Sequence, residues 1–337
     1  MKEILRGGII GCGFFAQHHI EGWSRVPGVE LVAACDLELQ RARAAAPHAY
    51  TSAQEMLDRE RLDFVEIVTR VDLHLPMVQL AVERKIPVLC QKPIAPDWAT
   101  AVKMVDIAEA AGVRLMIHEN WRWQPWYRAV RAAIDAGRIG APIGYGFITR
   151  CRDGLGENPY PRQAYFRGLK RFLIDEALVH HLDTARFLFG DLEAVYAQAV
   201  RRNPRIQGED FALICVMHRS GVQGWVDGHR FLDALQDGPV LGDAFFEGED
   251  GRLRVMPTGD VRLGGAVYWT NNVTAGYRGD SVRATQAHFI DGLRGGIPFE
   301  SEGRAYLHTF AAVEACYRST ATHCQVRIDE VTATAGA

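Results

Sequence analysis

Residues 5–16, LRGGIIGCGFFA, hold the strongest structural signal in this chain of 337 residues. An apolar run predicts a strand, the glycines after it predict a tight turn, and the residues that follow predict a helix. Gly11, Gly13 and Ala16 form a GxGxxA element. The first glycine permits the turn, the second lets the backbone approach a pyrophosphate, and the alanine allows close packing of helix on strand. The helix N-terminus would then face the anion.

A second part of this signal is Asp36, which follows the strand-like run 30–35 and lies 25 residues after Gly11. A carboxylate there can accept hydrogen bonds from the adenosine ribose, and its charge repels a 2′-phosphate. We therefore expect NAD as the cofactor and NADP as less favoured, although Arg41 and Arg43 could support some NADP binding. The alternative is an ordinary tight turn followed by a surface aspartate.

The two parts of the chain differ in their pattern of predicted strands and helices. The first 120 residues alternate strand-like runs (4–10, 30–35, 64–69, 87–90, 114–118) with helical segments (15–25, 39–46, 53–58, 74–84, 98–111), which predicts a parallel sheet with crossover helices. After Asn120, longer strand candidates follow one another, with a helix near 175–189 and two final helices near 282–294 and 304–319. We predict an α/β chain with a Rossmann domain, residues 1–120, and a second α/β domain, residues 121–337, built on a large, mainly antiparallel open sheet.

Composition excludes several classes of protein. The 38 Lys+Arg residues against 41 Asp+Glu residues give a net charge of −3, so no basic field exists for nucleic acid. No apolar run approaches the roughly 18 to 20 residues of a membrane span. The seven cysteines show no CxxC pair, which favours a reducing, cytoplasmic compartment. Adjacent histidines on a helix point in different directions, so we expect no metal site.

Two further segments carry candidate catalytic residues. Lys92, in the stretch Cys90-Gln-Lys-Pro93, follows a strand-like run at the edge of the sheet where Rossmann folds bind ligands. Further along, Glu176, His180 and Asp183 are spaced i, i+4, i+7 and would share one face of a helix. Plainer interpretations exist: an exposed lysine, a buried core histidine and two solvated carboxylates.

Together these motifs resemble the Gfo/Idh/MocA family of sugar and polyol oxidoreductases over nearly the whole chain. Lys92 matches the lysine of the family's E-K-P motif, and His180 and Asp183 match its D-x-x-x-H-x-x-D helix. Gln91 replaces the family's glutamate, and Glu176 replaces its aspartate. The remaining matching positions are Thr69 with His74, in a loop where Arg70 replaces a common proline, and Asn120 with Arg122.

The resemblance implies hydride transfer between a hydroxyl-bearing carbon and nicotinamide. Lys92 and His180 would share the hydroxyl proton, with Glu176 as a third catalytic residue. Gln91, having no charge, would stabilise the ammonium of Lys92 less than a glutamate would. The expected cofactor contacts are Gly11, Gly13, Phe14, Phe15, Ala16, Asp36, Thr69, Arg70, His74, Gln91 and Lys92.

The substrate is expected to be a sugar, a polyol or a sugar acid. A group of cations near the second domain's first strand favours a carboxylate, because arginine forks bind carboxylates well. Its members are Arg122, Arg150, Arg152, Arg162, Arg167, Lys170 and Arg171. Alternatively, several of them pair with neighbouring acidic residues. We expect Arg122, Tyr165 and Asp183 to contact the substrate.

Two other functions stay open. Relatives include enzymes that recycle NAD while they isomerise, epimerise or hydrolyse a sugar acid, and the same fold occurs in regulators that bind a dinucleotide without catalysis. The resemblance also implies a homodimer or homotetramer that associates through the exposed face of the second domain's sheet.

Overall fold

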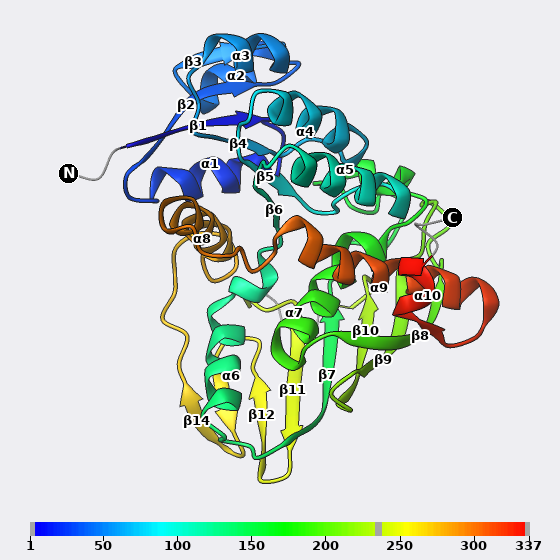
Figure 1. Ribbon diagram of the computed structural model, residues 1–337. Coiled ribbons are helices and arrows are strands. Elements are labelled where there is room, and N and C mark those ends of the chain that lie inside the picture. The colour runs from blue at the N-terminus through cyan, green and yellow to red at the C-terminus, as the bar shows by residue number, and fades with distance from the viewer. Residues whose placement is uncertain (1–3, 233–237, 334–337) are drawn as a thin grey trace. The chain divides into compact units, whose positions relative to one another are not determined.

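A computed structural model describes residues 4–232 and 238–333 and divides the chain into two compact units (Figure 1). Unit 1 comprises Met1–Asn120 and Asp280–Leu307, and unit 2 comprises Trp121–Gly279 and His308–Ala337. The segment Asp280–Leu307 therefore belongs to unit 1, whereas we expected it in the second domain. Its helix α8 (Ser281–Gly295) packs on α1 (Ala16–Ser24), and its apolar side chains complete a core cluster of unit 1.

Unit 1 is built on a six-stranded sheet in the order β3-β2-β1-β4-β5-β6, in which every pair is parallel. This order is that of dinucleotide-binding Rossmann folds, so the predicted fold is confirmed. The strands are β1 Leu5–Ile10, β2 Val29–Cys35, β3 His48–Tyr50, β4 Phe64–Ile67, β5 Val88–Gln91 and β6 Leu115–His118. The other helices are α2 Leu39–Ala45, α3 Ala53–Arg59, η1 Val71–Leu73, α4 His74–Glu83 and α5 Trp98–Ala110.

Local sequence accounts for several boundaries in unit 1. The hydroxyl of Ser52 accepts the backbone N–H of Glu55 at 3.3 Å and caps α3. A carboxylate oxygen of Asp97 accepts the backbone N–H of Thr100 at 2.8 Å and caps α5. Such caps satisfy N–H groups that have no partner inside the helix. β3 was not predicted, because its three residues carry too short a pattern.

Unit 2 is built on a nine-stranded sheet in the order β14-β13-β12-β11-β7-β10-β9-β8-β15. Only β7 and β10 pair in parallel, so the predicted mainly antiparallel sheet is confirmed. The strands are β7 Pro142–Arg150, β8 Leu192–Val200, β9 Phe211–His218, β10 Gln223–His229, β11 Gly242–Gly248, β12 Gly251–Val255, β13 Val261–Leu263, β14 Ala266–Trp269 and β15 Val326–Arg327. The three short strands at the sheet's ends, β13, β14 and β15, were not predicted.

The helices of unit 2 lie before, between and after these strands (Figure 1). They are η2 Trp121–Trp123, α6 Pro125–Asp135, η3 Ala164–Gly168, η4 Leu173–Leu178, α7 Val179–Phe189 and α10 Ile328–Thr332, together with α9 Gly303–Thr322, which begins in unit 1 and ends in unit 2. Of the helices in the described ranges, none is both long and apolar enough to cross a membrane.

The predicted helix 175–189 is not one regular α-helix. Its first part, η4, is a π-helix, and α-helical geometry starts at Val179. A π-helical turn contains more residues than an α-helical turn. Glu176 therefore lies in a π-helical turn and not in the regular α-helix that was expected, whereas His180 and Asp183 keep an i, i+3 relation within α7.

Candidate active site

The carboxyl ends of neighbouring parallel strands form the first part of the site, within unit 1. The strand registers bring the last residues of β2, β1 and β4 level with one another and with Cys90, the residue before the end of β5. The residues that follow these strands therefore lie along one edge of the sheet: Gly11, Asp36, Thr69 and Lys92. This is the edge at which open α/β sheets bind their ligands.

The glycine turn has the geometry that a dinucleotide needs. Gly11 has a φ of +92°, and a Cβ atom there would lie 2.5 Å from the Val68 carbonyl oxygen, so only glycine fits. A Cβ on Gly13 would meet nothing within 4 Å, which leaves open space beside the turn. Asp36 stabilises the turn, because its Oδ2 accepts the N–H of Cys12 at 2.8 Å. With α1 beginning at Ala16 behind the turn, these residues fit a bound dinucleotide.

The two phenylalanines of the turn differ in exposure. Phe14 is 50% exposed, and Phe15 is half-buried with its ring 5.3 Å from that of His19. Phe14 therefore presents a free aromatic surface beside the turn, whereas Phe15 packs partly on α1.

The loop after β4 is tied to the segment after β5 through His74. The His74 ring is 1% exposed, and its nitrogens lie 3.2 Å from the carbonyl oxygen of Thr69 and 3.3 Å from that of Ile94. Burial lowers the pKa of His74 below its ordinary value. Arg70 is exposed and pairs with Asp72 at 3.1 Å. His74 thus positions the loop that carries Thr69.

Lys92 is half-buried and directly follows β5, joined to Pro93 by a cis peptide bond. Its backbone N–H donates to Oε1 of Gln91 at 2.7 Å. The Gln91 side chain is only 6% exposed and reaches the ring of His19 on α1, with 2.8 Å between its Nε2 and the His19 Nε2. Gln91 therefore acts on the backbone of Lys92 and on a buried histidine.

His180 lies in α7, within unit 2. It is 7% exposed, and its ring stacks on that of Trp121 with 4.4 Å between centroids and 13° between planes. The neighbouring His181 faces elsewhere: it contacts the hydroxyl of Thr149 and stacks on Phe147 at 4.9 Å. The stack on Trp121 fixes the plane of the His180 imidazole.

Arg122 and Asp183, both expected to contact the substrate, bind each other. The Arg122 guanidinium donates to the two oxygens of Asp183 at 2.7 and 2.6 Å, and Thr309 adds a hydroxyl at 2.9 Å. Asp183 is fully buried. A bidentate pair of this kind fixes both side chains, and it joins η2 to the helix that carries His180.

Glu176 and Tyr165 lie in the segments that precede α7. Glu176 is half-buried in the π-helix, a geometry that is frequent at functional sites. Tyr165 is 55% exposed; its hydroxyl accepts a hydrogen bond from Gln163 at 3.3 Å and interacts with the carboxylate of Glu176.

Two more of the expected carboxylate-binding cations form ion pairs within unit 2. Arg150 pairs with Asp227, and Arg171 pairs with Glu314 at 2.7 Å. Both of these acidic partners are distant in the sequence, and Arg171 also interacts with the neighbouring Asp175, as the alternative interpretation predicted. The exposed cations of this group are Arg152, Arg162 and Lys170.

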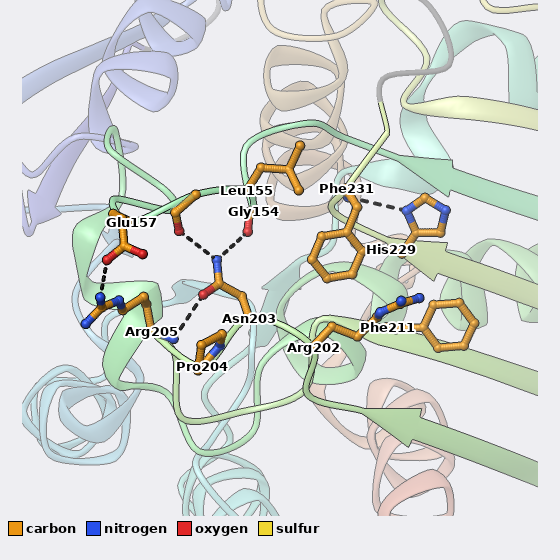
Figure 2. A pocket seen from close by; sticks show the side chains of 11 residues that line it. Gly154, Leu155, Glu157, Arg202, Asn203, Pro204, Arg205, Phe211, His229 and Phe231 are labelled. Atoms are coloured by element: carbon orange, nitrogen blue, oxygen red, sulfur yellow. Dashed lines mark hydrogen bonds and ion pairs between the residues drawn. The ribbon is translucent and has the colours of Figure 1, made fainter.

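A cavity of about 590 Å³ opens within unit 2 and contains none of the predicted site residues (Figure 2). Its walls include a stack of rings, Phe211 on His229 at 6.1 Å and His229 on Phe231 at 5.8 Å, with Arg202 5.7 Å from the Phe231 ring. Asn203 holds the opposite wall by donating to the Gly154 carbonyl at 2.7 Å. The sequence did not reveal this cavity, because its walls come from four separate segments.

Comparisons with known proteins agree with this geometry. Residues 5–119 match the oxidoreductase family with an NAD-binding Rossmann fold, and residues 127–253 match the GFO/IDH/MocA C-terminal domain. The chain therefore belongs to the Gfo/Idh/MocA oxidoreductase family, which confirms the resemblance seen in the sequence. It is an oxidoreductase with an NAD-binding domain.

Several relatives are similar over nearly their whole length. A D-apiose dehydrogenase of Paraburkholderia graminis is 36% identical, covering 94% of this chain and 87% of that protein, and one of Rhizobium rhizogenes is 33% identical, covering 94% and 95%. A crystal structure of an oxidoreductase from Agrobacterium radiobacter, in complex with NAD+, L-tartaric acid and magnesium, is 32% identical with a TM-score of 0.89, covering 97% and 99% of the two chains.

Proposed function

We propose that this protein oxidises a hydroxyl-bearing carbon of a sugar, polyol or sugar acid and transfers the hydride to NAD. The observation that carries the proposal is the row of Gly11, Asp36, Thr69 and Lys92 along one sheet edge, in a chain similar over 94% of its length to D-apiose dehydrogenases. When bound, the nicotinamide ring of NAD accepts the hydride.

The protein's part in cofactor binding follows from the turn after β1. Gly13 leaves open space for the pyrophosphate, and the helix N-terminus provides N–H groups. The Asp36 carboxylate accepts ribose hydroxyls and repels a 2′-phosphate, which favours NAD over NADP. Phe14, exposed in the same turn, would contact the cofactor.

Proton transfer is the chain's main chemical task, because the hydroxyl proton must leave as the hydride departs. We assign this task to Lys92 and His180: the lysine donates a hydrogen bond to the oxygen that becomes negative, and the imidazole accepts the proton. The stack on Trp121 keeps the His180 ring in one plane. Glu176, in the π-helix before α7, is the third member that we assign.

The substrate class is a small polyhydroxy compound, with D-apiose as the first candidate. The exposed cations Arg152, Arg162 and Lys170 and the exposed Tyr165 are the groups that would distinguish an acidic from a neutral sugar. Arg122 and Asp183 contribute to the site by fixing the position of α7, because their charged groups bind each other.

The second part of the proposal is that copies of this chain associate with one another. The face of the unit 2 sheet that carries Val200 (51% exposed) and Leu213 (40% exposed) offers apolar surface to a second copy in a homodimer or homotetramer. All seven cysteines are free thiols, which supports the prediction of a cytoplasmic location.

The test is a set of reactions of the protein with NAD+ and D-apiose, myo-inositol or L-tartrate, followed by the absorbance of reduced nicotinamide. We expect NADH with one of these substrates and a loss of about a hundredfold or more in kcat for Lys92→Ala. Lys103→Ala, on the exposed face of α5, is the matched control and should behave as the unchanged protein.

Two outcomes would overturn the proposal. A Lys92→Ala protein with undiminished kcat would remove the lysine from the mechanism. Binding of NAD+ without NADH formation from any sugar, polyol or sugar acid would favour a recycling isomerase, epimerase or hydrolase, or a dinucleotide-binding regulator.

A further inference from the structure

Unit 1 contains a fully buried carboxylate that the proposed reaction does not use. Glu66 lies in the middle of β4 and is 0% exposed. It accepts hydrogen bonds from Nδ1 of His19 at 2.8 Å, from Nε1 of Trp23 at 2.6 Å and from Nε2 of Gln286 at 3.3 Å. Three N–H donors of this kind stabilise the ionised form of a carboxylate in a buried position.

The hydrogen bonds of Gln91 determine where His19 carries its proton. The backbone N–H of Lys92 can only donate, so the atom of Gln91 that receives it at 2.7 Å is the amide oxygen. The amide nitrogen therefore faces Nε2 of His19 at 2.8 Å and must donate to it. Nε2 of His19 consequently holds a lone pair, and the proton resides on Nδ1, which donates to Glu66.

The same proton assignment excludes a metal ion in this cluster. Ligand atoms of His19, Glu66 and His118 all lie within 4.8 Å of one another, a spacing that could suit an ion. Both nitrogens of His19 are already committed, one to the Gln91 amide and one to the proton shared with Glu66. His118 lies 3.7 Å from Glu66, and neither of its ring nitrogens has a hydrogen-bond partner among the described residues. The cluster is therefore a hydrogen-bonded His19–Glu66 pair with His118 beside it, and His19 offers no lone pair to an ion.

We propose that Glu66 and His19 are positioning residues that act on Lys92 through Gln91. Glu66 fixes the tautomer of His19, His19 fixes the orientation of the Gln91 amide, and the amide oxygen anchors the backbone of Lys92 where β5 ends. Every donor in this relay points the same way, from Lys92 towards Glu66. The effect on turnover rests on the proposed function of Lys92, because a shift of about 1 Å in a catalytic group can cost a hundredfold in rate. The proton assignment does not rest on that function.

A charge swap between the two ends of the relay tests the proposal. In Glu66→Gln/Gln91→Glu, the amide oxygen introduced at position 66 can accept from Trp23 and Gln286 while the NH₂ group beside it donates to Nδ1 of His19. His19 then carries its proton on Nε2 and donates to the carboxylate at position 91, whose other oxygen still accepts the N–H of Lys92. The number of buried carboxylates is unchanged, and every hydrogen bond is retained with the relay reversed.

Each single variant breaks the relay. In Glu66→Gln, the new NH₂ must face an N–H of His19 or of Trp23, so two donors oppose each other. In Gln91→Glu, a second carboxylate faces His19, which can satisfy both carboxylates only by taking up a further proton and donating from both nitrogens, so the single Nδ1–H form is lost. We expect kcat to fall by about 10-fold to 100-fold in each single variant and to return to within about 3-fold in the swap, with the KM for NAD changing less than about 3-fold throughout.

His118→Phe is the matched control, because His118 is equally buried and lies beside Glu66 outside the relay. Its kcat should stay within about 3-fold of the unchanged protein, as expected when packing alone changes. A loss of kcat in His118→Phe equal to that in Gln91→Glu would overturn the proposal. So would a swap variant that is no better than the single variants, either in kcat or, where the single variants do not fold, in the yield of folded protein.

A second measurement separates this proposal from the proposed function. Histidine ¹⁵N chemical shifts report which ring nitrogen is protonated, and His19→Phe identifies the signals of His19. We expect the Nδ1–H form in the unchanged protein and the Nε2–H form in the swap. An Nε2–H form or an imidazolium in the unchanged protein would refute the relay, even if the protein proved to be a dehydrogenase. The expected forms in a protein without dehydrogenase activity would leave the relay standing and refute only the function of Lys92.

Discussion

Asp36 holds the glycine turn with its carboxylate. Its oxygens accept the backbone N–H groups of Cys12 at 2.8 Å and of Glu38 at 2.9 Å, so the side chain shapes the turn that we expect to receive the pyrophosphate. We also expect its negative charge to set the preference between NAD and NADP. The position of Asp36 beside the turn could be predicted from the sequence, because the turn and the acidic residue follow neighbouring strands of one βαβ unit.

Asp36→Asn should therefore weaken NAD binding and relax the preference. The amide keeps one oxygen for Cys12 but loses the charge, and the loss of a hydrogen bond to a charged group costs about 1.5 kcal/mol, or roughly tenfold in KM for NAD. The ratio of kcat/KM for NADP to that for NAD should rise, as measured by parallel kinetics with both cofactors. Asp58→Asn, in exposed α3, is the control. An unchanged ratio of the two kcat/KM values would show that Asp36 does not contact the adenosine ribose.

The partners of Gln91 were beyond sequence reasoning at the residue scale. We expected Gln91 to affect the ammonium of Lys92, but its side chain binds His19, 72 positions away in the chain. A faint signal was present: Glu66 is a charged residue inside an apolar strand, and an interior charge requires partners. Only packing of α1 on the sheet reveals which partners these are.

At the scale of elements, the Arg122–Asp183 pair fastens η2 to α7. The pair is almost fully removed from water, with side-chain exposures of 6% and 0%. Breaking a buried pair by removing one partner leaves an uncompensated charge, which costs about 3 to 5 kcal/mol. Removal of both partners costs less, because no buried charge remains.

We therefore expect Arg122→Met to lower the free energy of unfolding by about 3 to 5 kcal/mol, measured by urea denaturation. The double variant Arg122→Met/Asp183→Leu should recover part of the loss. Arg304→Ala removes two exposed ion pairs, in which all side chains are about half exposed, and should cost no more than about 1 kcal/mol. Equal losses in Arg122→Met and Arg304→Ala would contradict the assignment of a buried, structural pair.

The start of the helix that carries His180 was mispredicted for a physical reason. The spacing of apolar residues indicated an α-helix, but a distant carboxylate holds its first backbone N–H groups. Glu209, 9% exposed, accepts the N–H of Phe172 at 3.2 Å and that of Ile174 at 3.0 Å. Partners from another segment thus support a π-helical start that local propensity alone would not favour.

At the scale of the whole molecule, buried neutral histidines make stability depend on pH. Nδ1 of His218 donates to the Gly190 carbonyl at 2.8 Å, and its Nε2 accepts the hydroxyl of Tyr145 at 2.9 Å. Burial lowers the pKa of His218 to about 4, from an ordinary value of 6.5. The unfolded chain therefore binds the proton more readily, so this contribution is complete above pH 6.5 and is lost as the pH falls towards 4.

We expect His218 alone to account for about 2 kcal/mol of the stability lost between about pH 7 and pH 5. His218→Asn keeps a donor for Gly190 and removes the titration, so its free energy of unfolding should fall less over this range. The measurement is urea denaturation at both pH values. His323→Asn is the control, since His323 is exposed and its φ of +56° suits asparagine. Identical pH dependence in His218→Asn and the unchanged protein would contradict a depressed pKa.

By itself, the sequence determined the class of the molecule. The features that define the class are local: the alternation of strands and helices, the glycine turn, Asp36 and the motif around Lys92. Such features depend on residues close together in the sequence, so they can be recognised without the structure. The tertiary structure alone decided that Asp280–Leu307 belongs to unit 1, that Arg122 and Asp183 bind each other, and that His19 links Glu66 to Gln91. Each of these contacts joins segments that are distant in the chain. A buried charge needs a polar partner and an apolar face needs an apolar one, but only the folded structure shows which segment supplies it.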